Sequence, residues 1–414
     1  MWPSAVAALC VLPLPFLASA APVTETAPKV DYDVIIVGGG PAGLAASSAL
    51  GRVRRNVLMV DSGEYRNAAT RHIHDVLGSD GVTGAYYRFK GRQQVSHYGT
   101  VDMINGTVTK ITPQNNSSSS NCYTPQGGYT LFTVTIARED NEPQTLTTFK
   151  VVIATGLKDL VPDTPGLLEN WGKGIYWCPW CDGYEHADQP LGLLGPMTSV
   201  PGTVREVLTL NRDLVAFVNG TDTPSNREAI KKAEPNWQDY LRLHNVTVDN
   251  RTIASIERLR SGVDPNADPS LFSYPEYDLF RVHFVNGPPT TRAGFITNFK
   301  KEQRSSIGQE AGVVLLGEKL GVDPAKGLVT SVPGIHAVGD CNSDNSTNVA
   351  HALYSGKKAA VFLHVQLQRE IADRELSDLS RTLGTRSLDE DARSLWDRMN
   401  GDEDDLLYAG PFDQ

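Results

Sequence analysis

The sequence is poor in cysteine and has no excess of basic residues. Five cysteines among 414 residues are too few for a fold held together by disulfides. Acidic residues outnumber basic ones, 48 to 38, and the net charge of −10 argues against nucleic acid or an anionic membrane surface as a partner. No segment after the N-terminal leader reaches about eighteen apolar residues, so we expect no membrane-spanning helix there. The length allows two or more domains with a large core.

The first twenty residues have the pattern of an export signal. Ala5 to Ala18 is an apolar run interrupted by prolines, and Ala18-Ser19-Ala20 is a small-x-small cleavage site. A short membrane anchor is the alternative, although the run is shorter than a bilayer requires. N-x-S/T sequons agree with export, and they begin at Asn105, Asn115, Asn116, Asn219, Asn245, Asn250 and Asn345. We therefore expect residues 1–20 to be a signal peptide and the mature chain to be a secreted, extracellular glycoprotein.

Two cysteines carry a redox-active spacing. Cys178 and Cys181 are separated by two residues, and Asp182 follows directly. A small structural disulfide is the alternative, and a zinc half-site would lack a second Cys-x-x-Cys or a His-x-x-x-His. Trp177 and Trp180 either shield this dithiol, bind substrate or belong to the core. The remaining cysteines of the mature chain pair, stay free or differ, and the sequence leaves this open for Cys122 and Cys341.

A dinucleotide-binding fingerprint begins at Gly38. The β-branched run 32–37 predicts a buried parallel strand, and residues 38–43 then fit Gly-x-Gly-x-x-Gly ahead of an alanine-rich helix. Gly38 permits a tight turn, Gly40 lets a pyrophosphate approach the backbone, and Gly43 lets helix and strand pack closely. The next strand ends at Asp61, whose carboxylate can accept a hydrogen bond from a ribose hydroxyl.

Residues 64–98 are rich in polar and aromatic groups and predict a loop and a helix over the cofactor. His72 and His74 suggest a metal pair, but no cysteine or acid cluster with ligand spacing supports it, so we expect no metal. We expect them to hydrogen-bond to the structure or the cofactor instead. A buried strand at 150–153 then leads to Ala154-Thr155-Gly156.

A second strand–helix–strand unit follows the dithiol but lacks a fingerprint. Its first loop, residues 196–202, contains no Gly-x-Gly-x-x-Gly. Its next strand ends in Asn219-Gly220-Thr221, which offers neither an acid for a ribose hydroxyl nor arginines for a 2′-phosphate. This predicts a nucleotide-type domain without a nucleotide site. Residues 253–292 predict a meander, followed by a buried strand ending at Gly339-Asp340 and a helix over 349–370.

The motifs at 38–43, 154–156, 178–183 and 339–340, in this order, resemble the low-molecular-weight thioredoxin-reductase family of flavoproteins over roughly residues 31–370. The resemblance implies an α/β fold with two Rossmann-like, three-layer ββα domains and a homodimer. The FAD domain (31–158 and 293–370) would be split by a central insert (159–292) carrying the Cys-x-x-Cys motif, and a charged extension (371–414) would follow.

The resemblance also implies roles for individual residues. Cys181 would lie nearer the flavin, Cys178 would exchange with substrate, and Asp182 would be the acid/base. His351, at the start of the helix after Gly339-Asp340, is a second candidate base because an imidazole titrates near neutral pH. The expected FAD contacts are Gly38, Gly40, Pro41, Ala42, Gly43, Asp61, Asn67, His74, Ala154, Thr155, Gly156, Gly339, Asp340 and Asn348.

The chain departs from that family in two places. The second glycine fingerprint is absent, and Thr347-Asn348 stands where the family has an Arg-Gln pair. Together with the leader, this resembles more closely the fungal FAD-dependent dithiol and sulfhydryl oxidases, which pass electrons to oxygen. We expect a secreted oxidase of small thiols such as glutathione, or of a dithiol, that reduces O2 to H2O2. An NADPH-dependent disulfide reductase and a non-catalytic flavin-binding protein are the alternatives.

Overall fold

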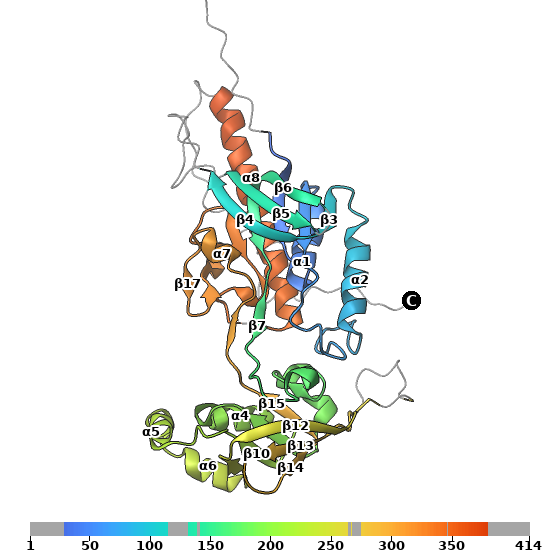
Figure 1. Ribbon diagram of the computed structural model, residues 1–414. Helices are drawn as coiled ribbons and strands as arrows, with labels where there is room; N and C mark the ends of the chain where they lie inside the picture. The colour runs from blue at the N-terminus through green and yellow to red at the C-terminus, as the bar shows by residue number, and fades with distance from the viewer. Residues whose placement is uncertain are drawn as a thin grey trace, which may run out of the picture.

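The computed structural model describes residues 29–114, 131–138, 141–263, 266, 275–345 and 347–379. The expected signal peptide, Cys122, the sequons at Asn115 and Asn116, and most of the charged extension lie outside these residues. The described chain forms two α/β units, and β7 runs between them (Figure 1). Within the same residues no helix is both long and apolar enough to cross a membrane.

The first unit is built on a mixed sheet with a parallel centre. β1 (Tyr32–Val37) lies between β6 (Asn141–Ile153) and β2 (Val57–Asp61), and the strand order is β19-β20-β21-β6-β1-β2-β3. β5 pairs antiparallel with both β4 and β6. The other strands of this sheet are β3 (Val101–Asn105), β4 (Thr107–Gln114), β5 (Leu131–Arg138), β19 (Val322–Asp323), β20 (Val329–Thr330) and β21 (Ile335–Ala337).

The register of the parallel strands brings their carboxyl ends to one edge. Val37 is opposite Val60 on β2 and Ile153 on β6, and Ile153 is opposite Ala337 on β21. The loops that follow these strands therefore start side by side. They carry the glycine fingerprint, Asp61, the Ala154-Thr155-Gly156 motif and the Gly339-Asp340 motif.

The alternation of side chains along β1 divides the first unit into two cores. Val34 and Ile36 face α1 (Pro41–Arg52) and α8 (Val349–Leu379), while Ile35 and Val37 face the opposite layer. A Cβ on Gly356 of α8 would lie 2.2 Å from the Ala42 carbonyl oxygen, so this glycine permits the close approach of the two helices. The helix expected to end at residue 370 continues to Leu379. α2 (Gly84–Val95) packs beside α1 (Figure 1).

The second unit is inserted between β7 (Leu157–Asp159) and β16 (Lys301–Gln303), which pair antiparallel. Its five-stranded parallel sheet has the order β11-β10-β9-β15-β8. The insert therefore extends beyond residue 292, where the sequence placed its end, because β15 lies inside this sheet. The bounds are β8 (Ile175–Tyr176), β9 (Leu191–Leu194), β10 (Leu214–Phe217), β11 (Thr247–Asp249) and β15 (Gly294–Thr297).

Helices and an antiparallel sheet cover the two faces of the insert's parallel sheet. α4 (Val200–Val207) and α6 (Trp237–Leu243) pack on one face through Val204 and Leu241. On the other face, Phe280 of the antiparallel sheet packs against Phe295 with ring centroids 5.5 Å apart. The strands of the antiparallel sheet are β12 (Ile253–Arg260), β13 (Leu279–Phe284) and β14 (Thr290–Arg292), and the other helices of the insert are α3 (Pro179–Asp182) and α5 (Pro224–Ala233). After β16 come α7 (Ile307–Glu310), β17 (Leu315–Leu316) and β18 (Lys319–Leu320).

Candidate active site

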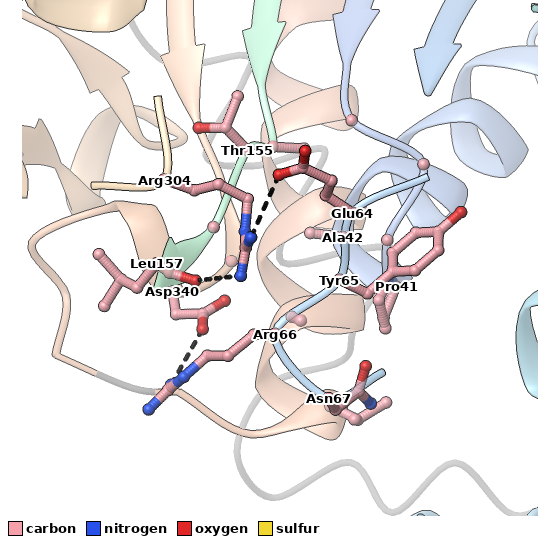
Figure 2. A pocket seen from close by; sticks show the side chains of 18 of the residues that line it. Pro41, Ala42, Glu64, Tyr65, Arg66, Asn67, Thr155, Leu157, Arg304 and Asp340 are labelled. Atoms are coloured by element: carbon pink, nitrogen blue, oxygen red, sulfur yellow. Dashed lines mark hydrogen bonds and ion pairs between the residues drawn. The ribbon is translucent and has the colours of Figure 1, made fainter. Parts of the chain in front are cut away.

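A cavity of about 390 Å³ lies at the carboxyl edge of the first sheet, within the size range of small-molecule and cofactor sites. Loops after β1, β2, β6 and β21 form most of its wall, and the dithiol segment of the insert completes it. Figure 2 shows Tyr65, Arg66 and Asn67, which line the cavity from the segment after β2. The cavity is thus the place where the two units meet.

The glycine fingerprint frames one side of the cavity. Gly38 has φ +113°, and a Cβ there would lie 2.4 Å from the Ala154 carbonyl oxygen. A Cβ on Gly43 would lie 1.9 Å from the Gly38 carbonyl oxygen, so only glycine allows this helix–strand contact. Gly40 differs, because a Cβ there would meet nothing within 4 Å. Gly40 is also the N-cap of α1 without a side-chain cap, which leaves amide groups of its first turn for a ligand phosphate.

Asp61 ends β2 as expected and faces the cavity. Its Oδ2 accepts hydrogen bonds from the Tyr65 hydroxyl at 2.6 Å and from Arg92 Nη1 at 3.0 Å, and its Oδ1 accepts one from the Gly63 amide at 3.1 Å. An ionised carboxylate can accept about four hydrogen bonds, so one position for a ribose hydroxyl remains. A Cβ on Gly39 would lie 2.1 Å from Asp61 Oδ2, a constraint that the fingerprint reasoning overlooked.

The other expected cofactor residues of the first unit lie mostly in the same wall. The cavity is lined by the cofactor candidates Gly38, Gly40, Pro41, Ala42, Asp61, Asn67, His74, Ala154, Thr155, Gly156, Gly339, Asp340 and Asn348. Gly43 is the exception, since it packs against Gly38 behind the wall. The open space at Gly40, the uncapped helix N-terminus and this set of strand-end loops fit the ADP part of FAD. Bound there, FAD would supply two-electron redox chemistry beside the dithiol.

The two cysteines of the dithiol are joined by a disulfide. Cys178 is the N-cap of the single turn α3, whose first residue is Pro179. Cys181 is among the residues that line the described cavity, whereas Cys178 is not. Cys181 is therefore the cysteine nearer the expected flavin site, while the exchange of Cys178 with substrate stays a prediction.

The two tryptophans beside the dithiol have different environments. Trp177 lines the cavity, stacks on Trp171 at 5.0 Å between ring centroids, and lies 5.2 Å below the guanidinium of Arg66. Trp180 is 70% exposed. Trp177 therefore belongs to the wall, while Trp180 is free to contact a substrate approaching Cys178.

Asp182 is the titratable group that directly follows the dithiol and lines the cavity. Burial raises the pKa of this carboxyl from 3.8 to about 7. His186 and His74 counteract this rise, and the negative charges of Glu185 and Glu276 add to it. A carboxyl that titrates near neutral pH can take a proton from a thiol and return it within one cycle.

His351 does not take the expected position in the cavity wall. Its Nε2 lies 2.7 Å from Asp344 Oδ2, and it is absent from the residues that line the described cavity, although Asn348 and Ala352 on either side line it. The Asn348 Oδ1 accepts the His351 amide at 2.7 Å and so caps α8. Asp182 is therefore better placed than His351 to act as the acid/base.

Two arginines of the wall were missed by the sequence reasoning. Arg66 donates to Asp159 from Nε at 2.7 Å and from Nη2 at 2.8 Å, and its Nη1 donates to Asp340 at 3.1 Å. Arg304 donates to the Leu157 carbonyl oxygen at 3.2 Å (Figure 2). Arg66 lay in a segment already noted for polar residues, but Arg304 reaches the cavity from beyond the insert and left no local signal.

The insert has the frame of a nucleotide domain, but its first loop lacks the glycine fingerprint. After β9, Met197 is 1% exposed and its amide donates to Thr221 Oγ1 at 2.9 Å. The Ser199 hydroxyl donates to the Pro196 carbonyl oxygen at 2.9 Å. No arginine or lysine occurs between Gly195 and Val204. The Met197 amide and the Ser199 hydroxyl therefore already have partners within the chain, and no basic side chain of this loop is available for a nucleotide phosphate.

Two dinucleotide-type units that share a cavity with a disulfide define a two-domain disulfide oxidoreductase, and comparisons with known proteins agree. Residues 32–256 match the family described as pyridine nucleotide-disulphide oxidoreductase. A "probable thioredoxin reductase" of Arthroderma benhamiae is 43% identical over 383 residues, which cover 92% of this chain and 91% of that protein. The thioredoxin reductase sirT of Leptosphaeria maculans is 33% identical over 329 residues, covering 76% and 88% of the two chains.

Solved structures show the same architecture. The crystal structure of HlmI has a TM-score of 0.67 and 29% identity, and the alignment covers 85% of this chain and 98% of that one. An oxidoreductase from Agrobacterium tumefaciens has a TM-score of 0.64 and 26% identity, covering 81% and 98%. The chain therefore belongs to the pyridine nucleotide-disulphide oxidoreductase family, as a thioredoxin-reductase-like flavoprotein. The expected α/β fold of two Rossmann-type units and the FAD cofactor are confirmed.

Proposed function

We propose that this oxidoreductase is a secreted thiol oxidase, which takes electrons from small thiols through Cys178 and Cys181 and passes them to oxygen. The observation that carries this direction is the loop after β9. A reductase of this fold takes electrons from a nicotinamide nucleotide bound at that loop, and close approach of its phosphates needs free amides and small residues. Here no glycine fingerprint is present, the Met197 side chain packs into the core of the insert, and the Met197 amide already donates to Thr221 Oγ1.

The chemistry of the dithiol follows from its placement. A substrate thiolate attacks Cys178 of the disulfide, a mixed disulfide forms, and Cys181 leaves as a thiolate at the cavity wall. A second substrate thiolate attacks the mixed disulfide, so two thiols leave as one disulfide and the enzyme keeps both electrons as its reduced dithiol. FAD held by the glycine fingerprint and Asp61 would supply the transfer of those two electrons to O2, which would give H2O2 and restore the enzyme disulfide.

Asp182 supplies the proton management for this exchange. Its pKa of about 7 means that it holds a proton in part of the population at neutral pH. It can therefore accept the proton of an incoming thiol, which must become a thiolate to attack. It can give that proton to the Cys181 thiolate as it leaves, and it can take a proton back when the dithiol is reoxidised, a step that releases protons.

The second candidate is a disulfide reductase that uses NADPH. The names of the similar fungal proteins favour it, since the Arthroderma benhamiae and Leptosphaeria maculans proteins are both called thioredoxin reductases. In that case electrons would flow from NADPH through FAD to the dithiol and then to a protein or small disulfide. The intact Cys178–Cys181 disulfide at the cavity argues against a non-catalytic flavin-binding protein.

An oxygen electrode decides between these directions. The FAD-loaded protein is mixed with glutathione, dithiothreitol and a panel of small dithiols, and oxygen uptake and H2O2 are followed. We expect uptake with at least one thiol and no bleaching of the flavin absorbance by NADPH under anaerobic conditions. Absence of oxygen uptake, together with bleaching by NADPH, would establish the reductase instead. Light scattering of the same sample tests the homodimer that the resemblance implies.

A further inference from the structure

A buried ionic cluster joins the FAD domain to the insert. Arg71, in the loop between β2 and α2, donates to Asp278 from Nη1 at 2.8 Å and from Nη2 at 3.0 Å. Nη1 also pairs with Glu276. The side chains of Arg71, Glu276 and Asp278 are 11%, 7% and 0% exposed. Both acids belong to the insert, so this fork crosses the boundary between the two units.

Asp278 is fixed within the insert by further hydrogen bonds. Asp278 Oδ1 accepts the Gly262 amide at 2.7 Å, and Oδ2 lies 3.4 Å from His186 Nε2. These contacts explain the proximity of His186, Glu276 and Asp278 without a metal ion, because the guanidinium and an amide take the carboxylate oxygens.

The cluster connects directly to the dithiol segment. His186 Nδ1 lies 3.0 Å from the Asp182 carbonyl oxygen, one residue after Cys181. The Glu276 amide donates to the Glu185 carbonyl oxygen at 2.7 Å. A displacement of Glu276 or Asp278 would therefore be transmitted to the turn that carries Cys181.

Neighbours of Arg71 make parallel contacts, and we call residues 66–74 the docking loop. The backbone at Ala69 approaches the insert so closely that a Cβ on Gly172 would lie 2.7 Å from its carbonyl carbon. His74 Nε2 lies 3.4 Å from Glu185 Oε1. Arg66 holds Asp159 at the end of β7, one of the two strands that join the insert to the rest of the chain.

Apart from such noncovalent contacts, the insert is attached to the FAD domain through the chain itself, at β7 and β16. Two short strands at one end of a domain fix its position poorly, because small rotations about them move the far parts of the insert. The docking loop lies beside the dithiol, so it fixes the insert where position matters for electron transfer. A planar guanidinium with two parallel hydrogen bonds also fixes orientation, which a single-point ammonium does not.

We propose that Arg71 is a positioning residue, which holds the insert so that Cys181 stays in the wall of the FAD cavity throughout turnover. This rests on the proposed function, because an enzyme whose electrons all enter through the dithiol never needs another part of the insert to reach FAD. The ionic cluster then keeps the two units in one arrangement during the whole cycle. A variant that lets the dithiol move away from the cavity should reduce FAD more slowly.

The test uses the full chain loaded with FAD and the variants Arg71→Gln and Arg71→Lys. Hydrogen exchange of β7, β16 and the docking loop is measured, together with the anaerobic rate at which dithiothreitol reduces the flavin. We expect faster exchange in all three segments and a reduction rate lowered about tenfold or more in Arg71→Gln. Arg71→Lys should recover part of the rate, because it keeps the charge without the fork. Arg242→Gln, which breaks an exposed pair with Asp239, is the control and should change neither measurement.

Two outcomes would overturn the proposal. One is a folded Arg71→Gln protein with unchanged hydrogen exchange in β7 and β16 and an unchanged rate of flavin reduction. If that variant does not fold, Glu276→Gln takes its place, because it keeps the Arg71–Asp278 fork. We expect its rate of flavin reduction to fall by about threefold. Unchanged hydrogen exchange and an unchanged reduction rate in Glu276→Gln would then overturn the proposal. Failure of the proposed function is separate: NADPH bleaching without oxygen uptake in the unaltered protein refutes the oxidase, while hydrogen exchange still tests Arg71.

Discussion

Replacing Asp182 by asparagine tests the acid/base assignment most directly. The substitution keeps the size of the side chain but removes the carboxyl whose pKa burial raises from 3.8 to about 7. We expect the turnover of thiols to fall and the step in its pH profile near pH 7 to disappear. An amide cannot accept a thiol proton, so the variant should turn over faster only as the pH approaches the pKa of the substrate thiol itself.

The same shift predicts a change in stability with a definite sign. Because the folded pKa of Asp182 is higher than the unfolded one, the folded protein binds more protons between about pH 4 and pH 7. This group therefore destabilises the fold increasingly as the pH rises through that window, and its full effect is present above pH 7. A shift of about three units corresponds to roughly 4 kcal/mol, and contact with solvent through the cavity reduces this to about 2 kcal/mol.

Guanidinium unfolding followed by tryptophan fluorescence measures this effect. Asp182→Asn should unfold at the same denaturant concentration as the unaltered protein near pH 4 and be more stable by about 2 kcal/mol at pH 8. Asp188→Asn, an equivalent change at an exposed position nearby, should have no such pH dependence. If Asp182→Asn keeps both the activity step near pH 7 and the stability profile of the unaltered protein, Asp182 is not the group that titrates there.

Two further predictions concern the dithiol and the fingerprint. Cys178→Ser should abolish turnover and leave the yellow flavin bound, and Cys181→Ser should do the same; turnover of either variant in the oxygen electrode would contradict the exchange mechanism. Gly40→Val should fold with a melting temperature close to the unaltered apoprotein but fail to bind FAD, because its side chain enters open cavity space. Gly43→Ala should instead destabilise the fold by about 2 kcal/mol or more, because its Cβ would overlap the Gly38 carbonyl oxygen; equal melting temperatures for the Gly40 and Gly43 variants would refute this division of roles.

The parts of the site that the sequence predicted lie together because of one rule of parallel sheets. Carboxyl ends of neighbouring parallel strands share an edge, so motifs after separate strands meet whatever their distance in sequence. Gly38 and Asp61 were expected from the glycine fingerprint and the following strand end, Thr155 and Gly339 from the family resemblance, and all four line the cavity. The α/β fold class could be predicted for a different reason, because each strand–helix–strand unit has a local hydrophobic pattern.

The docking of the insert had no such local signal. Arg71 lies in a loop without periodicity. Its partners Glu276 and Asp278 lie 205 and 207 residues later in the sequence. Pairing across that distance depends on how two finished domains meet, which neither spacing nor periodicity encodes. His351 was suggested by its place at a helix start, but it does not line the described cavity, and its Nε2 lies 2.7 Å from Asp344 Oδ2.

The C-terminal end of the insert was placed too early in the sequence, and the reason is local. β15 is only four residues long and follows directly on the antiparallel meander, so Gly294–Thr297 looked like the return to the FAD domain. Its place between β9 and β8 depends on tertiary pairing alone. Short strands at domain boundaries are the elements that pattern reasoning assigns least reliably, because too few side chains reveal their alternation.

The nested order of the two sheets has a consequence for how the chain is made. All strands of the insert's parallel sheet lie between Ile175 and Thr297, whereas β6 of the FAD domain must wait for β21, where Ile335 pairs with Val151. Domains generally fold as units as they emerge from the ribosome. The insert, with its two cysteines already close in sequence, can therefore finish first, and the FAD cavity gains its last wall only when the chain has been synthesised as far as Ala352.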